Sequence, residues 1–239
     1  MTQTRWAVLG SANIAAKSFL PAMRAAGGRA VVVGSRNPER ASTWAEANQV
    51  DRVADYAAAI DDDEVDAIYI ALPNLEHTKW ATRAAATGRA VLCEKPLGVD
   101  SADVEQLLSG LPDGALLWEA FVFAFHPQTD HIGQELGELG RIREIVSEFS
   151  FIAADPANIR WQPDLAGGAL RDVGCYCVRF ARLIFDAEPE HAAARAFVQH
   201  GVDGDLAAIL DFADERRLVL SASMRRAPST YTRVIGETG

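Results

Sequence analysis

The pattern of apolar and polar residues divides the chain into two regions with different rhythms. Up to about residue 121, short apolar runs alternate with segments of helical spacing. This alternation predicts βαβ units, whose right-handed crossovers build a parallel sheet. The expected strands are residues 5–9, 30–34, a brief one around Val53, 66–72, 90–93 and 115–120. The expected helices are residues 14–26 with a bend at Pro21, 38–47 with Asn37 as N-cap, 56–60, 75–87 and 101–108 with Ser101 as cap.

After residue 121 the rhythm changes. Helices are expected at residues 127–136 and 169–185, and strands at 142–151, 192–199, 206–212, 218–224 and 231–235. Consecutive strands without intervening helices favour an antiparallel sheet. The predicted fold is therefore α/β, with a parallel sheet in residues 1–121 and an α+β domain in residues 122–239 whose sheet is mostly antiparallel and open-faced.

Composition and charge exclude several classes of function. Asp and Glu number 33 against 23 Lys and Arg, an acidic balance that argues against binding to a nucleic-acid backbone. No run approaches the roughly 18 apolar residues of a membrane-spanning helix, and the first six residues lack the apolar core of a secretory signal. The three cysteines include no CxxC pair, so no disulfide framework or zinc site is expected. We expect a cytoplasmic protein without membrane or metal partners.

A glycine-containing loop follows the first strand. It comprises Gly10, Ser11, Ala12, Asn13 and Ile14, and a helix comes after it. This is the layout of the Rossmann dinucleotide fingerprint, in which backbone N–H groups and the helix start face a pyrophosphate. Because alanine occupies the middle glycine position, the methyl group of Ala12 must point away from the phosphate. A plain strand–turn–helix with a glycine hinge is the alternative interpretation.

The end of the second strand indicates which dinucleotide binds. NAD-binding domains place an acidic residue there to hold the ribose 2′-hydroxyl. Here the residues are Ser35 and Arg36, with Arg40 one turn into the next helix. Arginine can meet a 2′-phosphate through a bidentate contact, so we predict NADP(H) in preference to NAD(H). The alternative is that Arg36 is a solvated turn residue.

Two further groups of residues suggest catalytic chemistry. Glu94 and Lys95 follow a buried strand that Pro96 must end, which places them at the carboxyl edge, where open α/β sheets bind ligands. Asp172 and Tyr176 are four residues apart at the start of a helix and so share one face. Taken alone, the first pair also fits an ordinary surface pair, and the second fits a capping Asp and a core Tyr.

Together these motifs resemble the glucose–fructose oxidoreductase, inositol dehydrogenase and related (Gfo/Idh/MocA) family, over essentially the whole chain. The matching segments are residues 5–10, 72–77, 93–96 and 167–176. Within the family, the chain looks most like the dimeric dihydrodiol dehydrogenases and the NADP-dependent xylose or glucose dehydrogenases. Residues 119–121 and 125–128 indicate the same branch.

The resemblance implies an NADP-dependent oxidoreductase that transfers a hydride between nicotinamide and a carbinol or carbonyl carbon of a sugar or a cyclic trans-diol. Tyr176 would exchange the hydroxyl proton, and a nearby Lys95 ammonium would lower the pKa of that tyrosine. Asp172 would orient the substrate. A non-catalytic NADP-binding sensor or scaffold of the same fold is the alternative.

The resemblance also implies further contacts with the ligands. Cofactor contacts are expected from Leu72, Pro73, Asn74, His77, Glu94 and Lys95. Substrate contacts are expected from Asp172 and, on weaker grounds, from Phe123, Arg160 and Trp161. The Lys95–Pro96 peptide bond is expected to be cis, and His77 is given no catalytic role.

The chain departs from the family pattern at two places. Ala124 stands where relatives usually carry arginine, which predicts a less polar or reshaped substrate pocket. The segment from Tyr231 to Gly239 resembles the point at which relatives enter the last part of their sheet and continue. We therefore expect either a truncated product or a cut-down second domain that lacks the family's C-terminal part. A homodimer or larger assembly through the C-terminal sheet is expected if that sheet is complete.

Overall fold

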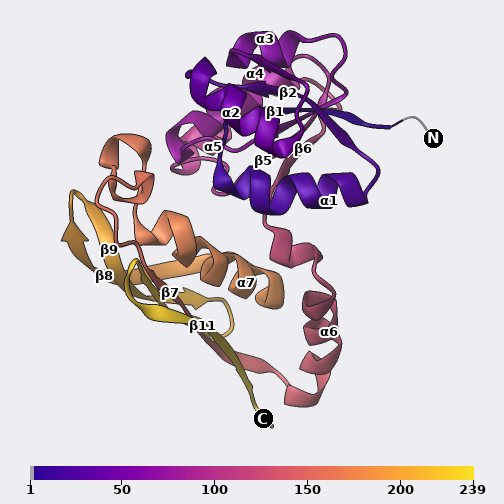
Figure 1. Cartoon of the computed structure of the whole chain (residues 1–239). Helices are drawn as coiled ribbons and strands as arrows, with labels where there is room; N and C mark the ends of the chain where they lie inside the picture. The colour runs from indigo at the N-terminus through magenta and orange to yellow at the C-terminus, as the bar shows by residue number, and fades with distance from the viewer. Residues whose placement is uncertain (1–2) are drawn as a thin grey trace. The chain divides into compact units, whose positions relative to one another are not determined.

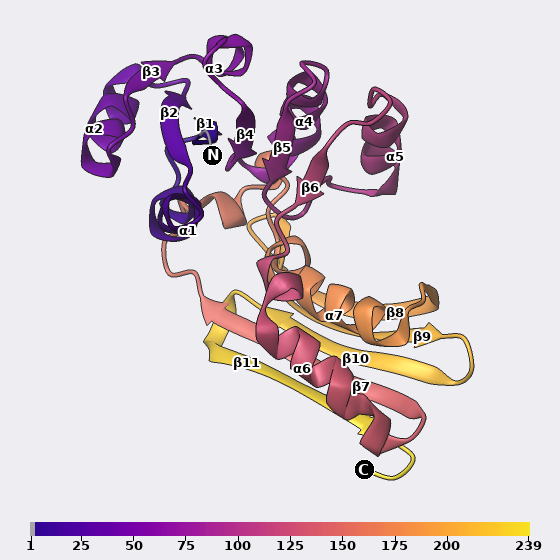
Figure 2. The ribbon, with the colours of Figure 1, turned by 90° about the vertical axis from the view of Figure 1, so that its right-hand side faces the viewer.

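The computed structural model describes residues 3–239, which divide into two compact units, one through Ala120 and one from Phe121 to Gly239. In the first unit (Figure 1), six parallel strands pair in the order β3-β2-β1-β4-β5-β6, which can be followed in Figure 2. The strands are β1 (Arg5–Leu9), β2 (Arg29–Gly34), β3 (Arg52–Ala54), β4 (Ala67–Ile70), β5 (Ala90–Cys93) and β6 (Leu117–Glu119). The helices are α1 (Leu20–Ala25), α2 (Pro38–Asn48), α3 (Tyr56–Asp61), α4 (His77–Ala85) and α5 (Ser101–Ser109).

The first sheet is buried on both faces. Neighbouring residues of each strand point to opposite faces, and both sets are apolar. Ala7 and Leu9 of β1 lie in one hydrophobic cluster, whereas Val8 between them lies in another. In β4, Ile68 and Ile70 join the first cluster and Tyr69 the second. Near-continuous apolar strands are typical of this arrangement, and the predicted Rossmann sheet is confirmed.

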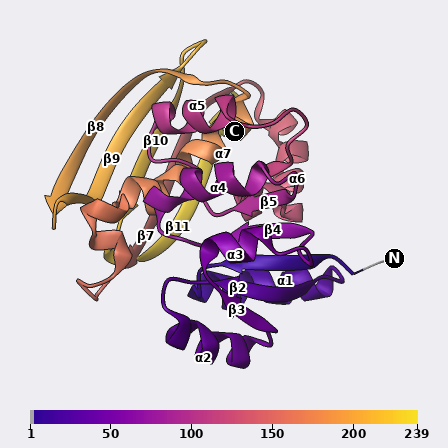
Figure 3. The same cartoon turned by 90° about the horizontal axis from the view of Figure 1, so that it is seen from above.

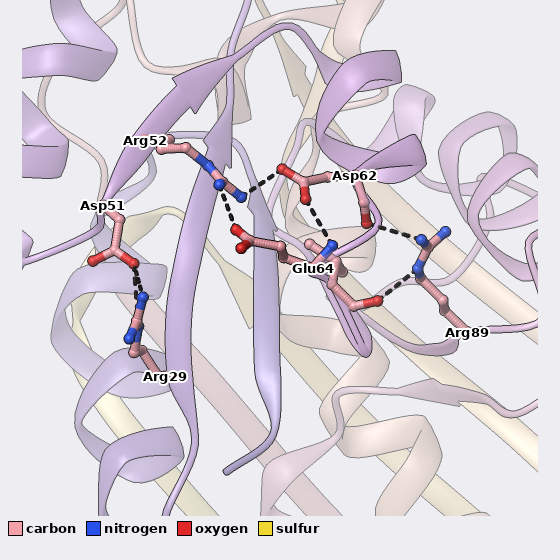
Figure 4. A network of polar contacts seen from close by, with 7 residues as sticks. Arg29, Asp51, Arg52, Asp62, Glu64 and Arg89 are labelled. Carbon is pink, nitrogen blue, oxygen red and sulfur yellow. Dashed lines mark hydrogen bonds and ion pairs between the residues drawn. The ribbon is translucent and has the colours of Figure 1, made fainter. Parts of the chain in front are cut away.

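Arginines hold the amino-terminal edge of this sheet together (Figure 4). Arg29 pairs with Asp51, and Arg52 pairs with Glu64 and, at 2.7 Å, with Asp62. Arg89 donates hydrogen bonds to three carbonyl oxygens in residues 60–65. The acidic run at residues 61–64 is therefore tied to basic partners at this edge, and the sheet's opposite, carboxyl edge carries the candidate site.

The second unit is a five-stranded sheet in the order β11-β7-β10-β9-β8 (Figure 3). Its strands are β7 (Ile142–Ile152), β8 (Pro189–Gln199), β9 (Val202–Phe212), β10 (Arg216–Ser223) and β11 (Arg225–Gly236), and its helices are α6 (Pro127–Glu135) and α7 (Cys175–Phe185). All neighbouring strands are antiparallel except β7 and β10. Helix α7 lies along one face of the sheet (Figure 2), and Ala181 and Phe185 pack into the core there. The predicted mostly antiparallel sheet is confirmed.

Local details correct two of the expectations and define a third. Asp100, rather than Ser101, caps α5, because its side chain accepts a hydrogen bond from the Asp103 N–H. Pro21 lies in the first turn of α1 and follows a π-helical turn (Ala15–Phe19), so the backbone changes its helical winding there. Strand β8 begins at Pro189, three residues before the expected start. No helix within residues 3–239 is long and apolar enough to cross a membrane.

Candidate active site

The loop after β1 has the geometry of the predicted phosphate loop. Gly10 has a φ of +98°, and a Cβ atom there would lie 2.5 Å from the carbonyl oxygen of Ala71, so only glycine fits. Ala12 packs against the hydrophobic cluster beneath the loop, whereas Asn13 and Ile14 are exposed. The methyl group of Ala12 thus faces the interior, as the fingerprint requires.

The turn after β2 brings two predicted residues close to this loop. Ser35 accepts a hydrogen bond from the backbone N–H of Asn37, and Asn37 caps α2 by accepting one from the Arg40 N–H at 2.9 Å. The Asn37 cap is confirmed. The Arg40 guanidinium reaches back to the carbonyl oxygen of Ser11 at 3.5 Å. Arg36 is exposed at the same turn, so both guanidinium groups are accessible to an anion.

The segment that carries Lys95 is held on both sides. Residues Lys95 and Pro96 are joined by the expected cis bond, which is confirmed. The Cys93 carbonyl before the segment accepts a hydrogen bond from Ala120 N–H at 2.7 Å, and the Leu97 N–H after it donates to the Glu119 carboxylate at 2.7 Å. These contacts fix the backbone that presents Lys95 at the carboxyl edge of β5.

Glu94 has a buried partner that the sequence pattern did not indicate. The hydroxyl of Tyr69 donates a 2.6 Å hydrogen bond to its Oε1 atom, and the Glu94 N–H donates to the carbonyl of Ile70. Tyr69 is 2% exposed and stacks on Phe19 with 3.8 Å between ring centroids. Tyr69 therefore fixes the Glu94 carboxylate. The sequence feature that could have indicated this contact was the hydroxyl of Tyr69 in an otherwise apolar strand.

His77 begins α4 and is 1% exposed. Its ring nitrogens lie 2.7 Å from the Pro96 carbonyl oxygen and 2.8 Å from the Leu72 carbonyl oxygen. Burial has the largest effect on the pKa of His77 and lowers it below the ordinary histidine value. The predicted residues Leu72, Pro73 and Asn74 form the loop between β4 and this helix, so one ring joins that loop to the Lys95 segment.

In the second unit, Asp172 lies in a π-helical turn (Leu170–Gly174) that leads directly into α7. The Arg160 guanidinium pairs with its carboxylate at 2.5 Å. Asp203 accepts a 2.7 Å hydrogen bond from the Leu170 N–H at the start of this turn, and Gly168 leaves room for that carboxylate. Burial raises the pKa of Asp203. Asp203 thus supports the start of the helical segment that carries Asp172. The sequence did not indicate this role, because Asp203 lies 31 residues further along the chain, in β9.

Tyr176 sits one turn further along, in an aromatic cluster. Its ring lies 5.5 Å from that of Phe121, 5.9 Å from Phe123 and 5.5 Å from Phe149, measured between centroids. Phe123, Phe149 and Tyr176 also line an apolar cavity of about 260 Å³ in this unit. Phe123, a predicted substrate residue, is therefore next to Tyr176.

The predicted residues fall into two groups, one in each unit. In the first unit, the phosphate loop, the Ser35–Arg40 turn, the Leu72–Asn74 loop and the Lys95 segment all follow the carboxyl ends of neighbouring parallel strands. In the second unit, Arg160 forms an ion pair with Asp172, and the ring of Phe123 packs against that of Tyr176. Trp161 is 4% exposed, and its indole N–H donates to the Ala153 carbonyl, so it supports the loop from within the core.

Comparison with known proteins covers both units. Residues 4–112 match the oxidoreductase family with an NAD-binding Rossmann fold, and residues 135–239 match the Gfo/Idh/MocA C-terminal domain. The chain is 36% identical to D-xylose 1-dehydrogenase (NADP⁺) 2 of Haloferax volcanii, over 95% of this chain and 71% of that protein. It is 31% identical to trans-1,2-dihydrobenzene-1,2-diol dehydrogenase of Xenopus laevis, over 99% of this chain and 74% of that protein.

Solved structures show the same similarity. A 3-ketoreductase from Actinomadura kijaniata, determined in complex with NADP and TDP-benzene, superposes with a TM-score of 0.91 at 33% sequence identity. The superposition covers 99% of this chain and 74% of that one. The motifs, the fold and these similarities agree with the resemblance inferred from the sequence, and the chain belongs to the Gfo/Idh/MocA family of oxidoreductases.

Proposed function

We propose that the protein is an NADP-dependent oxidoreductase that interconverts a carbinol and a carbonyl group on a sugar or a cyclic trans-diol. The observation that carries the proposal is the placement of the phosphate loop, the Leu72–Asn74 loop and Lys95 at the carboxyl ends of β1, β4 and β5, three adjacent parallel strands. This edge is where open α/β sheets bind dinucleotides. A phosphate-binding loop and a reactive lysine therefore share one edge.

The residues present fit NADP. We propose that the backbone of the phosphate loop holds the pyrophosphate and that Arg36, Arg40 and Ser35 hold the 2′-phosphate. The Arg40 guanidinium lies 3.5 Å from the Ser11 carbonyl oxygen, which supports a position close to the phosphate loop. At the nicotinamide end, the proposed contacts are Leu72, Pro73, Asn74, Glu94 and Lys95; the expected contact from the His77 side chain is not proposed, because that ring is 1% exposed. When bound, the cofactor accepts or supplies the hydride.

The acid–base work is assigned to side chains of this chain. We propose that the Tyr176 hydroxyl exchanges a proton with the substrate hydroxyl, and that the Lys95 ammonium stabilises the negative charge developing on that oxygen. Asp172 would accept a hydrogen bond from a neighbouring substrate hydroxyl, with Arg160 fixing its carboxylate. Phe123 would pack against the less polar part of the substrate.

The substrate class follows from what the relatives share. Their names specify D-xylose, a trans-dihydrobenzene diol and a dTDP-linked keto sugar. The first two compounds have a ring carbinol beside a second hydroxyl group. The third is a keto sugar, in which a ring carbon is already a carbonyl. A small molecule with vicinal ring oxygens is therefore the proposed substrate. We propose a second copy of the chain as the protein partner, bound through the sheet face that exposes Phe197 and Ile209.

The direct test is turnover. Purified protein is mixed with NADP⁺ and a panel of aldoses and cyclic trans-diols, and NADPH formation is followed by absorbance. We expect turnover on at least one aldose or diol, with NAD⁺ a poorer oxidant. Tight NADPH binding without turnover on any compound would overturn the enzyme proposal and leave the sensor or scaffold alternative.

Coenzyme preference should depend on the two arginines. We expect Arg36→Ala combined with Arg40→Ala to raise KM for NADP⁺ by about 10–100-fold and to leave KM for NAD⁺ nearly unchanged, because only the 2′-phosphate loses charge-assisted contacts. The control is Arg29→Ala at the other end of β2, where the side chain pairs with Asp51. Equal effects on both coenzymes would contradict the assignment.

A further inference from the structure

His77 occupies an unusual chemical position. Both groups that its ring contacts are carbonyl oxygens, one on Leu72 and one on Pro96. Carbonyls only accept, so a neutral imidazole with one N–H can donate to one of them, whereas an imidazolium donates to both. The ring is almost fully buried, which keeps water from replacing either contact. The number of hydrogen bonds across this link therefore depends on one proton.

Several groups act on that proton. Burial and the helix N-terminus disfavour the charged ring, and the nearby Lys95 ammonium acts in the same direction. The two carbonyls and the Glu94 carboxylate favour the charged ring. Because burial dominates, the pKa of His77 lies below its ordinary value. A neutral ring donates one hydrogen bond across this link, and a protonated ring donates two.

The Pro96 contact acts next to the reactive lysine. The Pro96 carbonyl lies one residue from Lys95, and the Leu72 carbonyl lies at the start of the loop proposed to meet the nicotinamide. Glu119 and Ala120, at the end of β6, also contact the segment. His77 approaches it from α4, so a displaced Pro96 carbonyl would shift the lysine backbone toward or away from its working position.

We infer that His77 is a positioning residue for Lys95. Its ring lies between the carbonyl oxygens of Leu72 and Pro96 and so links the Leu72–Asn74 loop to the segment that carries Lys95. The inference rests on the proposed function for the catalytic role of Lys95, and on the geometry alone for the link itself. It gives the buried His77 ring a positioning role in place of the expected cofactor contact.

The first test uses variants. We expect His77→Gln to lower kcat by about 10–100-fold with a smaller change in substrate KM, since a small displacement of a reacting group has effects of this size. His77→Asn serves as a second, shorter amide variant if the glutamine protein is poorly folded. His191→Gln, on strand β8, is the matched control and should keep the wild-type rate. A wild-type kcat in folded His77→Gln and His77→Asn would overturn the inference.

A double-mutant cycle separates positioning from general structural damage. If His77 acts through Lys95, adding His77→Gln to Lys95→Ala should produce no further fall in the residual kcat. Full multiplication of the two effects would overturn the inference. Wild-type turnover in Lys95→Ala alone would instead overturn the catalytic role of Lys95, so the two failures are distinguishable.

The link can also be measured without a substrate. Nitrogen NMR of histidine-labelled protein reports the protonation of both ring nitrogens, and His77→Gln identifies the signal among the five histidines. We expect one hydrogen-bonded N–H at neutral pH and conversion to the doubly protonated ring below the ordinary histidine pKa. A ring that titrates like a solvent-exposed histidine would overturn the inference.

Discussion

Lys95→Ala is expected to lower kcat by about 10²–10⁴-fold, the range associated with loss of a positioned acid–base or charge-stabilising group. The protein should remain folded, because the backbone groups of Cys93, Pro96 and Leu97 keep their hydrogen bonds in this variant. NADPH affinity should change much less than kcat. The measurements are steady-state kinetics with the substrate found in the panel and a fluorescence titration of NADPH.

Lys79→Ala is the matched control for this variant. Lys79 is an exposed lysine on α4, with a long contact of 3.9 Å to Glu76. It should keep wild-type turnover and cofactor affinity. If Lys95→Ala behaved like this control, the ammonium group would have no part in the reaction, and the proposed chemistry would need another cation.

Tyr176→Phe should lower kcat by about 10²–10³-fold while leaving the fold intact. The substitution removes the hydroxyl and keeps the ring, so packing against Phe121, Phe123 and Phe149 persists. The pH dependence of kcat should also lose the limb that belongs to the proton-exchanging group. Both quantities come from kinetics measured across a pH series, with thermal unfolding as the test of structure.

Tyr231→Phe provides the comparison. Tyr231 is exposed on β11, and losing its hydroxyl should alter neither kcat nor the pH profile. An unchanged pH profile in Tyr176→Phe, with kcat close to that of Tyr231→Phe, would contradict the proton-exchange role. A fall in kcat accompanied by a large loss of thermal stability would show that the hydroxyl is needed for folding instead.

Local patterns predicted much of the fold because they depend on residues close together in the chain. Alternating apolar strands and helices indicated the parallel sheet, and Asn37 next to Pro38 indicated the start of α2. The same reasoning misplaced the cap of α5 by one residue, since Asp100 and Ser101 are both good capping residues and only the backbone geometry distinguishes them.

The chemistry of the site was predictable by residue type but not by partner. Glu94 and Lys95 were recognisable at a strand end, yet nothing local indicates that Tyr69 meets Glu94, 25 residues earlier in the chain. Asp172 was predicted as a substrate ligand, and its pairing with Arg160 shows how its carboxylate is held. Trp161 was predicted for the same pocket on a weaker basis and is a core residue.

The sequence by itself determined the order of elements and the glycine-containing loop after β1, because helical spacing, strand alternation and turn chemistry act over a few residues. Only the tertiary structure decided which groups face one another. Strand order places β4 beside β5, so the carbonyls of Leu72 and Pro96 meet the two nitrogens of His77. Contacts of this kind depend on sheet pairing and burial, which join distant segments and leave no local pattern in the chain.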